Sequence, residues 1–385
     1  VCKNCWNVTT KKSASHLGID GQYICIHIIC MIKEVLSGMI KRVLHTLFPD
    51  KNLSKFPTTS LNKKLSLLDV GARDGIGYPW NTEKSGNLNV ILVEPDAQEA
   101  ELLRKHHQGD ILPYALWSKE TELVLNINNS PGTSSLLEPN MSFLCQFDDS
   151  QRFEAKNKIT ISTKTIDDLA CNGKLTDVDF MKIDTQGSEL DVLKGGVNYL
   201  KNNLVGLESE VEFSSMYQDQ PLFSELEIFV RQELGLELWD IRKSYWKYSQ
   251  SRYKNPTKGR LIFGDALFLR PISTLDSWLL SMDSVKAKTK LHMLITTTLA
   301  FGYLDYTDAI LNVDFVDKYL SKEDKQQFMD HIRKLHKSIY PFKNGLGLLY
   351  LPLQVLANCF KPTYQGWASF ESKHLGSRKK GFFWL

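Results

Sequence analysis

The sequence predicts an α/β fold: a mostly parallel sheet of seven strands with helices on both faces, followed by a helical C-terminal appendage. Three observations lead to this prediction. Short apolar runs recur between Leu65 and Leu269, and helical patterns separate them. Near-continuous apolar strands that alternate with helices are typical of a parallel sheet covered on both faces. Beyond Pro271 the strand pattern stops and helical spacing takes over.

The predicted strands are runs of apolar residues bounded by polar or turn-forming ones. In chain order they span residues 65–71, 88–94, 111–117, 178–184, 204–212, 236–241 and 261–269. Helical patterns between them fall at 97–106, 188–194 and 222–234. Two further segments, 121–128 and 158–162, alternate apolar and polar residues, which predicts an inserted antiparallel pair.

The chain divides into three predicted parts. Residues 1–63 form an N-terminal extension with an amphipathic helical stretch from Ile24 to Phe48. Residues 64–271 carry all the predicted strands, and residues 272–385 form a mostly helical C-terminal extension with a basic and aromatic end. Packing on the main domain is the ordinary interpretation of both extensions, and contact with a membrane surface is the alternative.

Composition and charge exclude several classes of protein. The 385 residues are 42% hydrophobic, which is typical of a globular protein with a large core. A net charge of +3 argues against nucleic acid as the partner. No uncharged apolar run reaches the roughly 20 residues that a membrane-spanning helix needs. The 7 cysteines are odd in number, and Cys2 and Cys5 have no second pair nearby, so we expect a cytoplasmic protein without a zinc site.

The most informative segment is the turn after the first predicted strand. Asp69 lies near the end of that strand, and Gly71 and Gly75 follow in the turn. Glycine suits the turn because the backbone must bend sharply and approach a ligand with no Cβ in the way. Glu94 ends the second strand, where a carboxylate can accept both hydroxyls of an adenosine ribose. Together these features favour a nucleoside site over an ordinary strand end in which Asp96 caps the next helix.

The spacing of the glycines distinguishes between nucleoside cofactors. A dinucleotide site prefers G-x-G-x-x-G, whereas Gly71 begins the pattern G-x-x-x-G-x-G. The segment Asp69-Val-Gly71 resembles the first motif of class I S-adenosylmethionine methyltransferases. Those enzymes bind a cofactor without phosphate and need no diphosphate-cradling glycines. The spacing therefore disfavours a nicotinamide oxidoreductase.

Five blocks of the sequence resemble the FkbM-type methyltransferases and occur in the order of that family. The longest is D-F-M-K-I-D-T-Q-G-S-E-L-D-V-L-K-G-G at 179–196. The others are V-E-P-D at 93–96, G-T-S-S-L-L-E-P at 132–139, E-V-E-F-S-S-M-Y-Q-D-Q-P-L-F at 210–223 and G-D-A-L-F-L-R at 264–270. The resemblance implies a Rossmann-like class I methyltransferase core over about residues 65–270. Within it, Arg73-Asp74 departs from the commoner turn D-V-G-A-N-x-G.

The resemblance also implies S-adenosylmethionine as the cofactor and indicates which residues contact it. These residues are Asp69, Gly71, Gly75 and Glu94, with Asp96, Ala115 and Leu116 toward the adenine. Because methyl transfer needs the acceptor in line with the sulfonium methyl, positioning supplies much of the rate.

Asp184 is the candidate for removing the proton of an acceptor hydroxyl. It lies at the C-terminal end of a predicted strand, where open α/β sheets place their ligands. The competing interpretation is that Asp184 caps the next helix, although Ser188 explains that start better. Glu189 and Asp191 are predicted to complement the helix dipole rather than to catalyse.

Glu208, Glu210 and Glu212 recur at every second position, so on a strand they face one way. Such a face is either exposed to solvent or arranged around a cation or a polar substrate. We favour the second interpretation, in which Glu210 and Glu212 join Asp184 as catalytic residues. Their hard oxygen atoms would also suit a divalent metal ion as a further cofactor.

The sequence therefore predicts an S-adenosylmethionine-dependent O-methyltransferase that acts on a hydroxyl of a glycan or another polar metabolite. Tyr217 and Gln220, in the loop at the same end of the sheet, would shape the pocket for this acceptor. The alternative is a catalytically inactive methyltransferase-fold module that binds the cofactor or a partner. The departure at Arg73-Asp74 keeps this alternative open.

Overall fold

The structure, a computed structural model, describes residues 61, 63–73, 75–83, 86–107, 109–254, 257–339, 347–360, 366–372 and 375–376. Several of the sequence predictions lie outside these residues. They concern Cys2, Cys5, the amphipathic stretch Ile24 to Phe48, Asp74 and most of the basic and aromatic segment 373–385.

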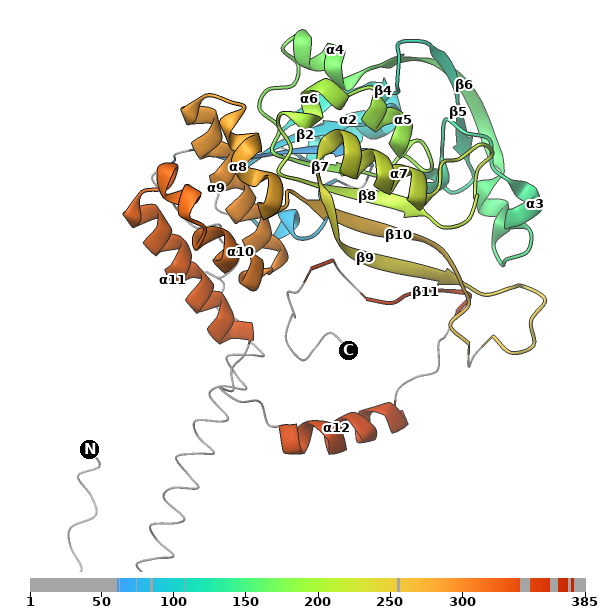
Figure 1. Ribbon diagram of the computed structural model, residues 1–385. Helices are drawn as coiled ribbons and strands as arrows, with labels where there is room; N and C mark the ends of the chain where they lie inside the picture. Colours follow the sequence, from blue (N-terminus) through green and yellow to red (C-terminus); the bar gives the residue numbers. More distant parts are fainter. Residues whose placement is uncertain are drawn as a thin grey trace, which may run out of the picture.

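A sheet of eight strands forms the centre of the fold, in the order β11-β9-β10-β8-β7-β1-β2-β3 (Figure 1). The strands are β1 (Leu65–Val70), β2 (Leu88–Val93), β3 (Asp110–Leu112), β7 (Phe180–Ile183), β8 (Gly206–Glu212), β9 (Glu237–Trp246), β10 (Arg260–Leu269) and β11 (Ala368–Phe370). Neighbours from β3 to β8 are parallel, and β10, β9 and β11 join them antiparallel. The predicted mostly parallel α/β sheet is confirmed.

Two differences from the predicted strands have local causes. The predicted strand 111–117 is divided into β3 and β4 (Ala115–Leu116), because Pro113 lies between them and cannot donate a ladder hydrogen bond. β11 is absent from the prediction. It comes from the C-terminal extension and pairs antiparallel with residues 244–246 of β9, so the main sheet has eight strands instead of seven.

A second, smaller sheet is inserted between β3 and β7. Its order is β4-β6-β5, with β5 (Glu122–Asn128) antiparallel to β6 (Ala155–Lys164). The antiparallel pair predicted from the alternating segments is therefore confirmed. The connection from β5 to β6 contains three short helices, η3 (Pro131–Thr133), α3 (Met141–Leu144) and η4 (Ser150–Phe153).

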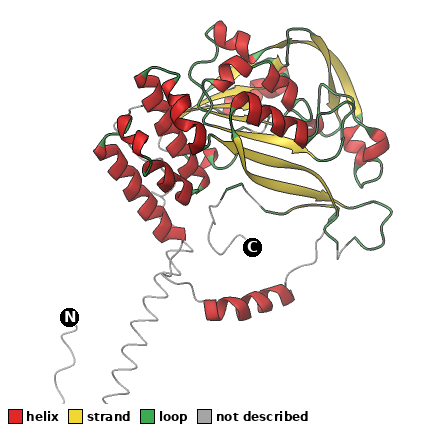
Figure 2. Cartoon of the chain, in the orientation of Figure 1, coloured by secondary structure: helices red, strands yellow, loops and turns green. Residues whose placement is uncertain are grey.

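Helices cover both faces of the main sheet (Figure 2). In the first part of the chain they are η2 (Trp80–Thr82), α2 (Ala97–His106), α4 (Ile166–Cys171), α5 (Glu189–Lys194), α6 (Val197–Lys201) and α7 (Phe223–Phe229), which continues as the π-helix η5 (Val230–Leu234). After β10 the chain forms α8 (Ile272–Leu280), α9 (Ser284–Phe301), α10 (Leu304–Leu311), η6 (Asp314–Lys318) and α11 (Lys322–Ile339), and then α12 (Gly347–Phe360), which lies apart from the sheet in Figure 1. Among the described residues, no helix is long and apolar enough to cross a membrane.

The two faces of β1 pack against different parts of the chain. Leu68 and Val70 belong to a core with α4, α5, α6 and α7. Leu65 and Leu67 belong to another core, with α8, α9, α10 and α11. Side chains alternate between faces along a strand, so α8–α11 cover one side of the sheet and α4–α7 cover the other.

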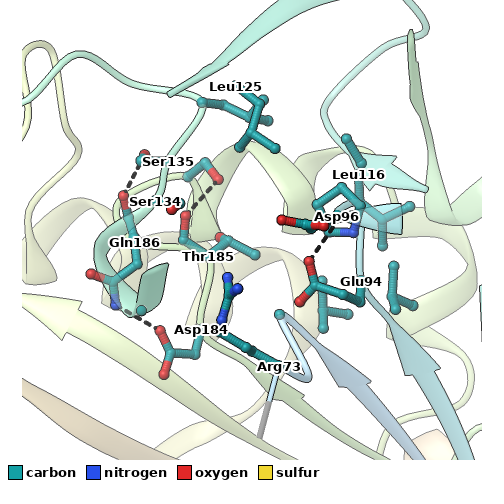
Figure 3. Close-up of a pocket in the computed structure, with 18 of the residues that line it drawn as sticks. Arg73, Glu94, Asp96, Leu116, Leu125, Ser134, Ser135, Asp184, Thr185 and Gln186 are labelled. Carbon is teal, nitrogen blue, oxygen red and sulfur yellow. Dashed lines mark hydrogen bonds between the residues drawn. The ribbon is translucent and has the colours of Figure 1, made fainter. Parts of the chain in front are cut away.

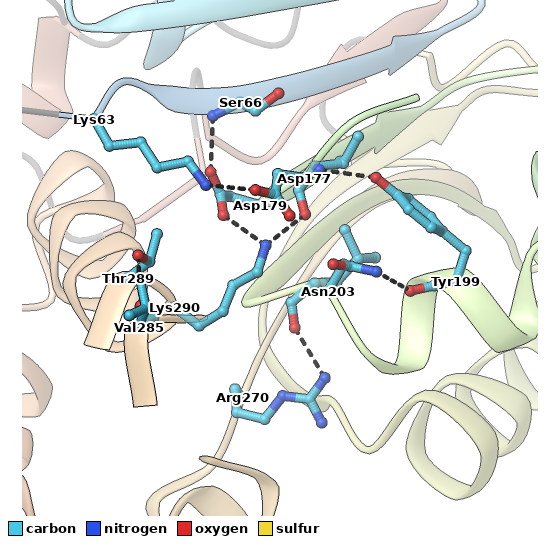
Figure 4. Close-up of polar contacts among 12 residues, drawn as sticks. Lys63, Ser66, Asp177, Asp179, Tyr199, Asn203, Arg270, Val285, Thr289 and Lys290 are labelled. Carbon is cyan, nitrogen blue, oxygen red and sulfur yellow. Dashed lines mark hydrogen bonds and ion pairs between the residues drawn. The ribbon is translucent and has the colours of Figure 1, made fainter. Parts of the chain in front are cut away.

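A buried ion pair joins α9 to the sheet (Figure 4). The Lys290 Nζ donates to Asp179 Oδ1 at 2.7 Å and to the carbonyl of Val178 at 2.9 Å. The other oxygen of Asp179 accepts the backbone N–H of Ser66 at 2.9 Å. Lys290 is 0% exposed, and burial lowers its pKa while it raises that of Asp179. The pair therefore connects β1, the start of β7 and α9 through enclosed charges.

Candidate active site

A cavity of about 210 Å³ opens at the carboxyl ends of β1, β2 and β7 (Figure 3). The turns after these three strands form much of its wall, and β4 and the segment after β5 complete it. Open α/β sheets bind ligands at this edge. The cavity lies where the sequence predicts the site.

Gly71 and Gly75 let the backbone approach the cavity closely. Both have a positive φ, 79° and 74°, which side chains with a Cβ rarely adopt. A Cβ on Gly71 would also overlap the carbonyl oxygen of Asp184, and one on Gly75 would overlap the imidazole of His107. The positive φ therefore favours glycine at both positions, and at Gly71 the backbone of Asp184 also leaves no room for a Cβ.

Glu94 follows β2 and presents its carboxylate to the cavity. Its Oε1 accepts the backbone N–H of Asp96 at 2.9 Å, and Asp96 in turn caps α2. Its Oε2 forms no hydrogen bond with a described residue. Burial raises the pKa of Glu94 to about 7, although the hydrogen bond from Asp96 and the charge of Arg73 oppose this shift. One oxygen is thus held in place and the other is available to a ligand.

Arg73, which marks the departure from the commoner turn, has partners on two sides of the cavity. Its Nη2 forms an ion pair with Glu99 of α2 at 2.5 Å. Its Nη1 donates to the carbonyl of Pro131, in the segment after β5, at 3.2 Å. The arginine therefore links two walls of the cavity, which gives this unusual turn residue a structural role.

The turn after β7 carries Asp184 to the cavity, and Gln186 holds it there (Figure 3). The Gln186 Nε2 donates to Asp184 Oδ1 at 2.9 Å and to Glu210 Oε2 at 2.7 Å. Its Oε1 accepts from the hydroxyl of Tyr217 at 3.1 Å, and its backbone carbonyl accepts from the hydroxyl of Ser135 at 2.7 Å. Asp184 Oδ2 forms no hydrogen bond with a described residue. Gln186 thus fixes one oxygen of Asp184 and leaves the other available.

Three more carboxyl groups lie close to Asp184. Asp184, Glu189 and Glu210 each offer an oxygen within 4.8 Å of the others, and Glu212 interacts electrostatically with all three. Burial raises the pKa of Glu189 to about 7 and raises those of Glu210 and Glu212 well above their usual range, and mutual repulsion adds to the effect. The cluster therefore holds part of its protons at neutral pH.

Two interpretations of this acidic region need correction. Glu208, Glu210 and Glu212 are only 9%, 5% and 2% exposed, so the alternative of a solvent-exposed acidic face is excluded. Ser188 forms no side-chain cap on α5. Instead Glu189 accepts the backbone N–H groups of Thr185 at 2.6 Å and Gly187 at 3.0 Å. Glu189 is therefore a buried residue that holds the turn of Asp184, rather than an acid that only complements the helix dipole.

Asp69 is placed behind the cavity wall. It is fully buried on β1, and its Oδ1 lies 3.5 Å from the Nζ of Lys182 on β7. Burial raises the pKa of Asp69, whereas the charge of Lys182 lowers it. Burial alone would lower the pKa of Lys182, but the charges of Asp69, Asp184 and Glu208 outweigh it and raise this pKa. Lys182 lines the cavity and Asp69 does not, so Asp69 contacts a lining residue instead of the cavity itself.

The cavity brings together most of the residues predicted to bind a cofactor. They are Gly71, Gly75, Glu94, Asp96, Ala115 and Leu116, without Asp69. Of the predicted catalytic residues, Asp184 lines the cavity, while Glu210 and Glu212 lie outside its lining. Further lining residues that the sequence did not single out are Tyr114, Leu125, Ser134, Ser135 and Gln186. The family-like blocks at 132–139 and 179–196 contain three of these and were the available signal.

The buried acids predict an unusual dependence of stability on pH. Glu94, Glu189 and Glu208 have pKa values of about 7, about 7 and about 8, against 4.5 for a free glutamate. As pH rises above 4.5 the unfolded chain loses these protons before the folded chain does, so stability is full below 4.5 and falls until about pH 8. Below about pH 6.5, His292 opposes this trend, because burial lowers its pKa to about 4.

We therefore expect a higher melting temperature at pH 6.5 than at pH 8, measured by circular dichroism at constant ionic strength. Each carboxyl contributes at most about 1.4 kcal/mol per pH unit. The variant Glu94→Gln cannot titrate at this position and should show a shallower slope. A melting temperature that rises toward pH 8 would contradict the burial of these charges.

Comparisons with known proteins bear on the same region of the chain. Residues 69–237 match the family model described as the methyltransferase FkbM domain. No match is found among curated proteins. Methyltransferase FkbM from Methylobacillus flagellatus KT is a similar solved structure, at 14% identity and a TM-score of 0.31, over 54% of this chain and 43% of its own. A proposed RNA methyltransferase from Pyrococcus horikoshii is another, at 11% identity and a TM-score of 0.27, over 55% and 76%. This chain thus spans less than half of the first of these structures.

Proposed function

We propose that this chain, which residues 69–237 identify as a methyltransferase of the FkbM family, transfers the methyl group of S-adenosylmethionine to a hydroxyl of a glycan or another polar metabolite. The family match supports methyl transfer. The observation that supports this reaction at this cavity is that two carboxylates line it, Glu94 from the end of β2 and Asp184 from the end of β7. Each keeps an oxygen without a hydrogen-bond partner among the described residues.

The residues of the cavity fit a nucleoside cofactor. Glu94 Oε2 can accept from ribose hydroxyls, and Ala115, Leu116 and Leu125 supply an apolar wall for a purine. Gly71 lets the turn after β1 pack closely against the backbone of Asp184, which brings the turns after β1 and β7 together at the cavity. S-adenosylmethionine supplies an electrophilic methyl group on sulfur. The protein binds and orients it.

Asp184 supports an oxygen atom as the acceptor. Methylation of an alcohol forms a C–O bond, breaks the C–S bond and releases the hydroxyl proton, which Asp184 Oδ2 can accept. Gln186 keeps Asp184 in position through Oδ1. The carboxyl of Glu210 accepts from the same Gln186 amide, so it helps to hold that amide in place.

A divalent metal stays a prediction of the sequence alone. The three closest carboxylates are Asp184, Glu189 and Glu210, whereas the predicted ligands included Glu212 in place of Glu189. The amide nitrogen of Gln186 already bridges Asp184 and Glu210. We therefore favour direct proton transfer to Asp184.

The remaining predictions concern activity, acceptor and location. An inactive module is not favoured, since Arg73 is accommodated by Glu99 and Pro131 and leaves Asp184 and Glu94 at the cavity. The small acceptor, the exclusion of nucleic acid and a cytoplasmic location remain proposals from composition and family.

The variant Glu94→Ala tests the cofactor site. We expect its dissociation constant for S-adenosylmethionine to rise by about ten- to a hundredfold, since a hydrogen bond to a charged group is worth about 1.5–3 kcal/mol. In the native protein the affinity should fall below pH 7, where Glu94 becomes protonated and loses acceptor capacity. Calorimetric titration measures both effects.

Glu101→Ala is the matched control, because Glu101 lies on the exposed side of α2 and pairs only with Arg104 among the described residues. It should leave the affinity unchanged. Equal affinities for Glu94→Ala and the native protein would remove Glu94 from the cofactor site.

A further inference from the structure

α12 is an apolar helix whose surface is exposed among the described residues. Its sequence, residues 347–360, contains no charged residue. Leu353, Val355 and Leu356 are 61%, 57% and 56% exposed, and Figure 1 shows the helix apart from the sheet and from α8–α11. Exposed apolar residues gathered on one element are typical of a site that binds another apolar surface.

The length of α12 limits what that surface can be. Its 14 residues extend about 21 Å at 1.5 Å per residue, which is less than the roughly 30 Å hydrocarbon core of a bilayer. Apolar helices of about 10–14 residues are typical of a protein core or of a membrane interface. The exposure of α12 among the described residues excludes a core position there, so an interfacial position fits better.

The hairpin of β9 and β10 carries exposed positive charge at two arginines, Arg252 and Arg260. Four other cations of the hairpin form ion pairs with carboxylates elsewhere in the chain, and Lys247 is buried. Residues 241–260 contain no aspartate or glutamate, and their cationic residues are Arg242, Lys243, Lys247, Arg252, Lys254, Lys258 and Arg260. Tyr248 and Tyr253 in the same hairpin are 42% and 74% exposed. Arg252 and Arg260 are exposed, and neither forms an ion pair with a described residue. Arg260 also donates to the hydroxyl of Tyr248 and lies over the ring of Phe143. Exposed cations without a carboxylate partner, beside exposed aromatic rings, are suited to an anionic headgroup layer.

The chain order brings these two features to one side of the molecule. β11 follows α12 and pairs with β9 at residues 244–246, within the basic hairpin. In the sequence, Lys343 and Lys361 flank α12, and a basic and aromatic segment follows at 378–384. Lysines that flank an apolar helix can reach anionic headgroups while the helix lies among the outer parts of the acyl chains.

We propose that α12 and the β9–β10 hairpin dock this protein on an anionic lipid bilayer. α12 lies in the interface with its leucine and valine side chains among the acyl chains, and Arg252 and Arg260 contact the headgroups. Docking holds the methyltransferase domain at the bilayer surface, because α11 precedes α12 and β11 follows it within the same fold. This surface is separate from the cavity and does not depend on the proposed reaction.

Co-sedimentation of the full chain with vesicles tests the proposal. We expect binding to vesicles of equal parts phosphatidylcholine and phosphatidylserine, weaker binding to phosphatidylcholine alone, and a loss of binding as salt rises. The double variant Leu353→Glu/Val355→Glu should bind at least about tenfold more weakly, because two apolar anchors are lost. Arg252→Gln should weaken binding by about fivefold and reduce its dependence on salt.

Leu280→Glu/Val285→Glu is the matched control. It changes one leucine and one valine that are 64% and 75% exposed on α8 and α9, and it adds the same charge. This variant should bind vesicles like the native protein. Circular dichroism of both double variants verifies folding. If Leu353→Glu/Val355→Glu fails to fold, the salt dependence of vesicle binding by Arg252→Gln, compared with that of the native protein, tests the proposal instead.

Two outcomes would overturn the proposal. The first is equal binding of all variants, or no binding of the native chain to either vesicle. The second is a concentration-dependent dimer, seen by sedimentation, that Leu353→Glu/Val355→Glu abolishes in a chain that does not bind vesicles. In that case a second copy of the chain covers α12.

Discussion

Replacing Asp184 by asparagine is expected to lower kcat by about a hundred- to ten-thousandfold, the usual contribution of a general base. Asparagine has the same shape and can still accept from Gln186 through its side-chain carbonyl. It cannot take the proton of the acceptor hydroxyl. The affinity for S-adenosylmethionine should therefore remain close to that of the native protein, as measured by calorimetry.

Measuring kcat requires a known acceptor. Incubating the protein with labelled S-adenosylmethionine and an extract of glycans and metabolites can identify one. Asp191→Asn is the matched control, because Asp191 lies on α5 outside the cavity lining and should support the native rate. A native rate for Asp184→Asn would show that the hydroxyl loses its proton elsewhere. A simultaneous loss of cofactor binding would show that Asp184 acts in binding.

Replacing Lys290 by methionine is expected to lower the free energy of unfolding by about 3–5 kcal/mol. Methionine fills much of the same space, but Asp179 is then left buried without a counter-charge. Because the pair joins α9 to the start of β7, the packing of the C-terminal helices on the sheet should weaken with it. Urea unfolding of the full chain, followed by circular dichroism, measures the change.

Two further variants serve as controls for the Lys290→Met measurement. Lys286→Met changes a partly exposed lysine on the same helix and should alter stability by less than about 0.5 kcal/mol. The double variant Lys290→Met/Asp179→Asn removes the uncompensated charge and should recover part of the loss. A native midpoint for Lys290→Met alone would mean that the ion pair does not stabilise the fold.

Strands with a strong local pattern were predictable from the sequence. The central strands β1 and β8 are buried along their whole length, and β2 is buried over its second half, so they form continuous apolar or regularly alternating runs in the sequence. β11 has only three residues, and the backbone of β9 that it pairs with is distant in the sequence. No local pattern in Ala368–Phe370 reports such a pairing. The split of β3 from β4 depended on one residue, Pro113.

In the candidate site, too, local features were predictable from the sequence and long-range contacts were not. Gly71, Gly75 and Glu94 were found because turn chemistry and strand ends are local features. Asp69 is not among the residues that line the cavity, and the register of β1 and β7 sets it opposite Lys182, a pairing that the sequence of β1 alone does not reveal. Glu189 has the position of an ordinary first-turn acid, and its role arises only when the turn after β7 folds over its carboxylate. Such contacts depend on tertiary structure.

β11 also has a consequence for the behaviour of the protein at high concentration. A strand at the edge of a sheet exposes N–H and C=O groups that can pair with another molecule. β11 occupies those groups at residues 244–246 of β9, and the N–H of Glu371 donates to the carbonyl of Lys243. The rest of β9 carries the charged residues Glu237, Asp240 and Arg242, and the new edge is only three residues long. The C-terminal segment thereby protects the sheet against edge-to-edge aggregation.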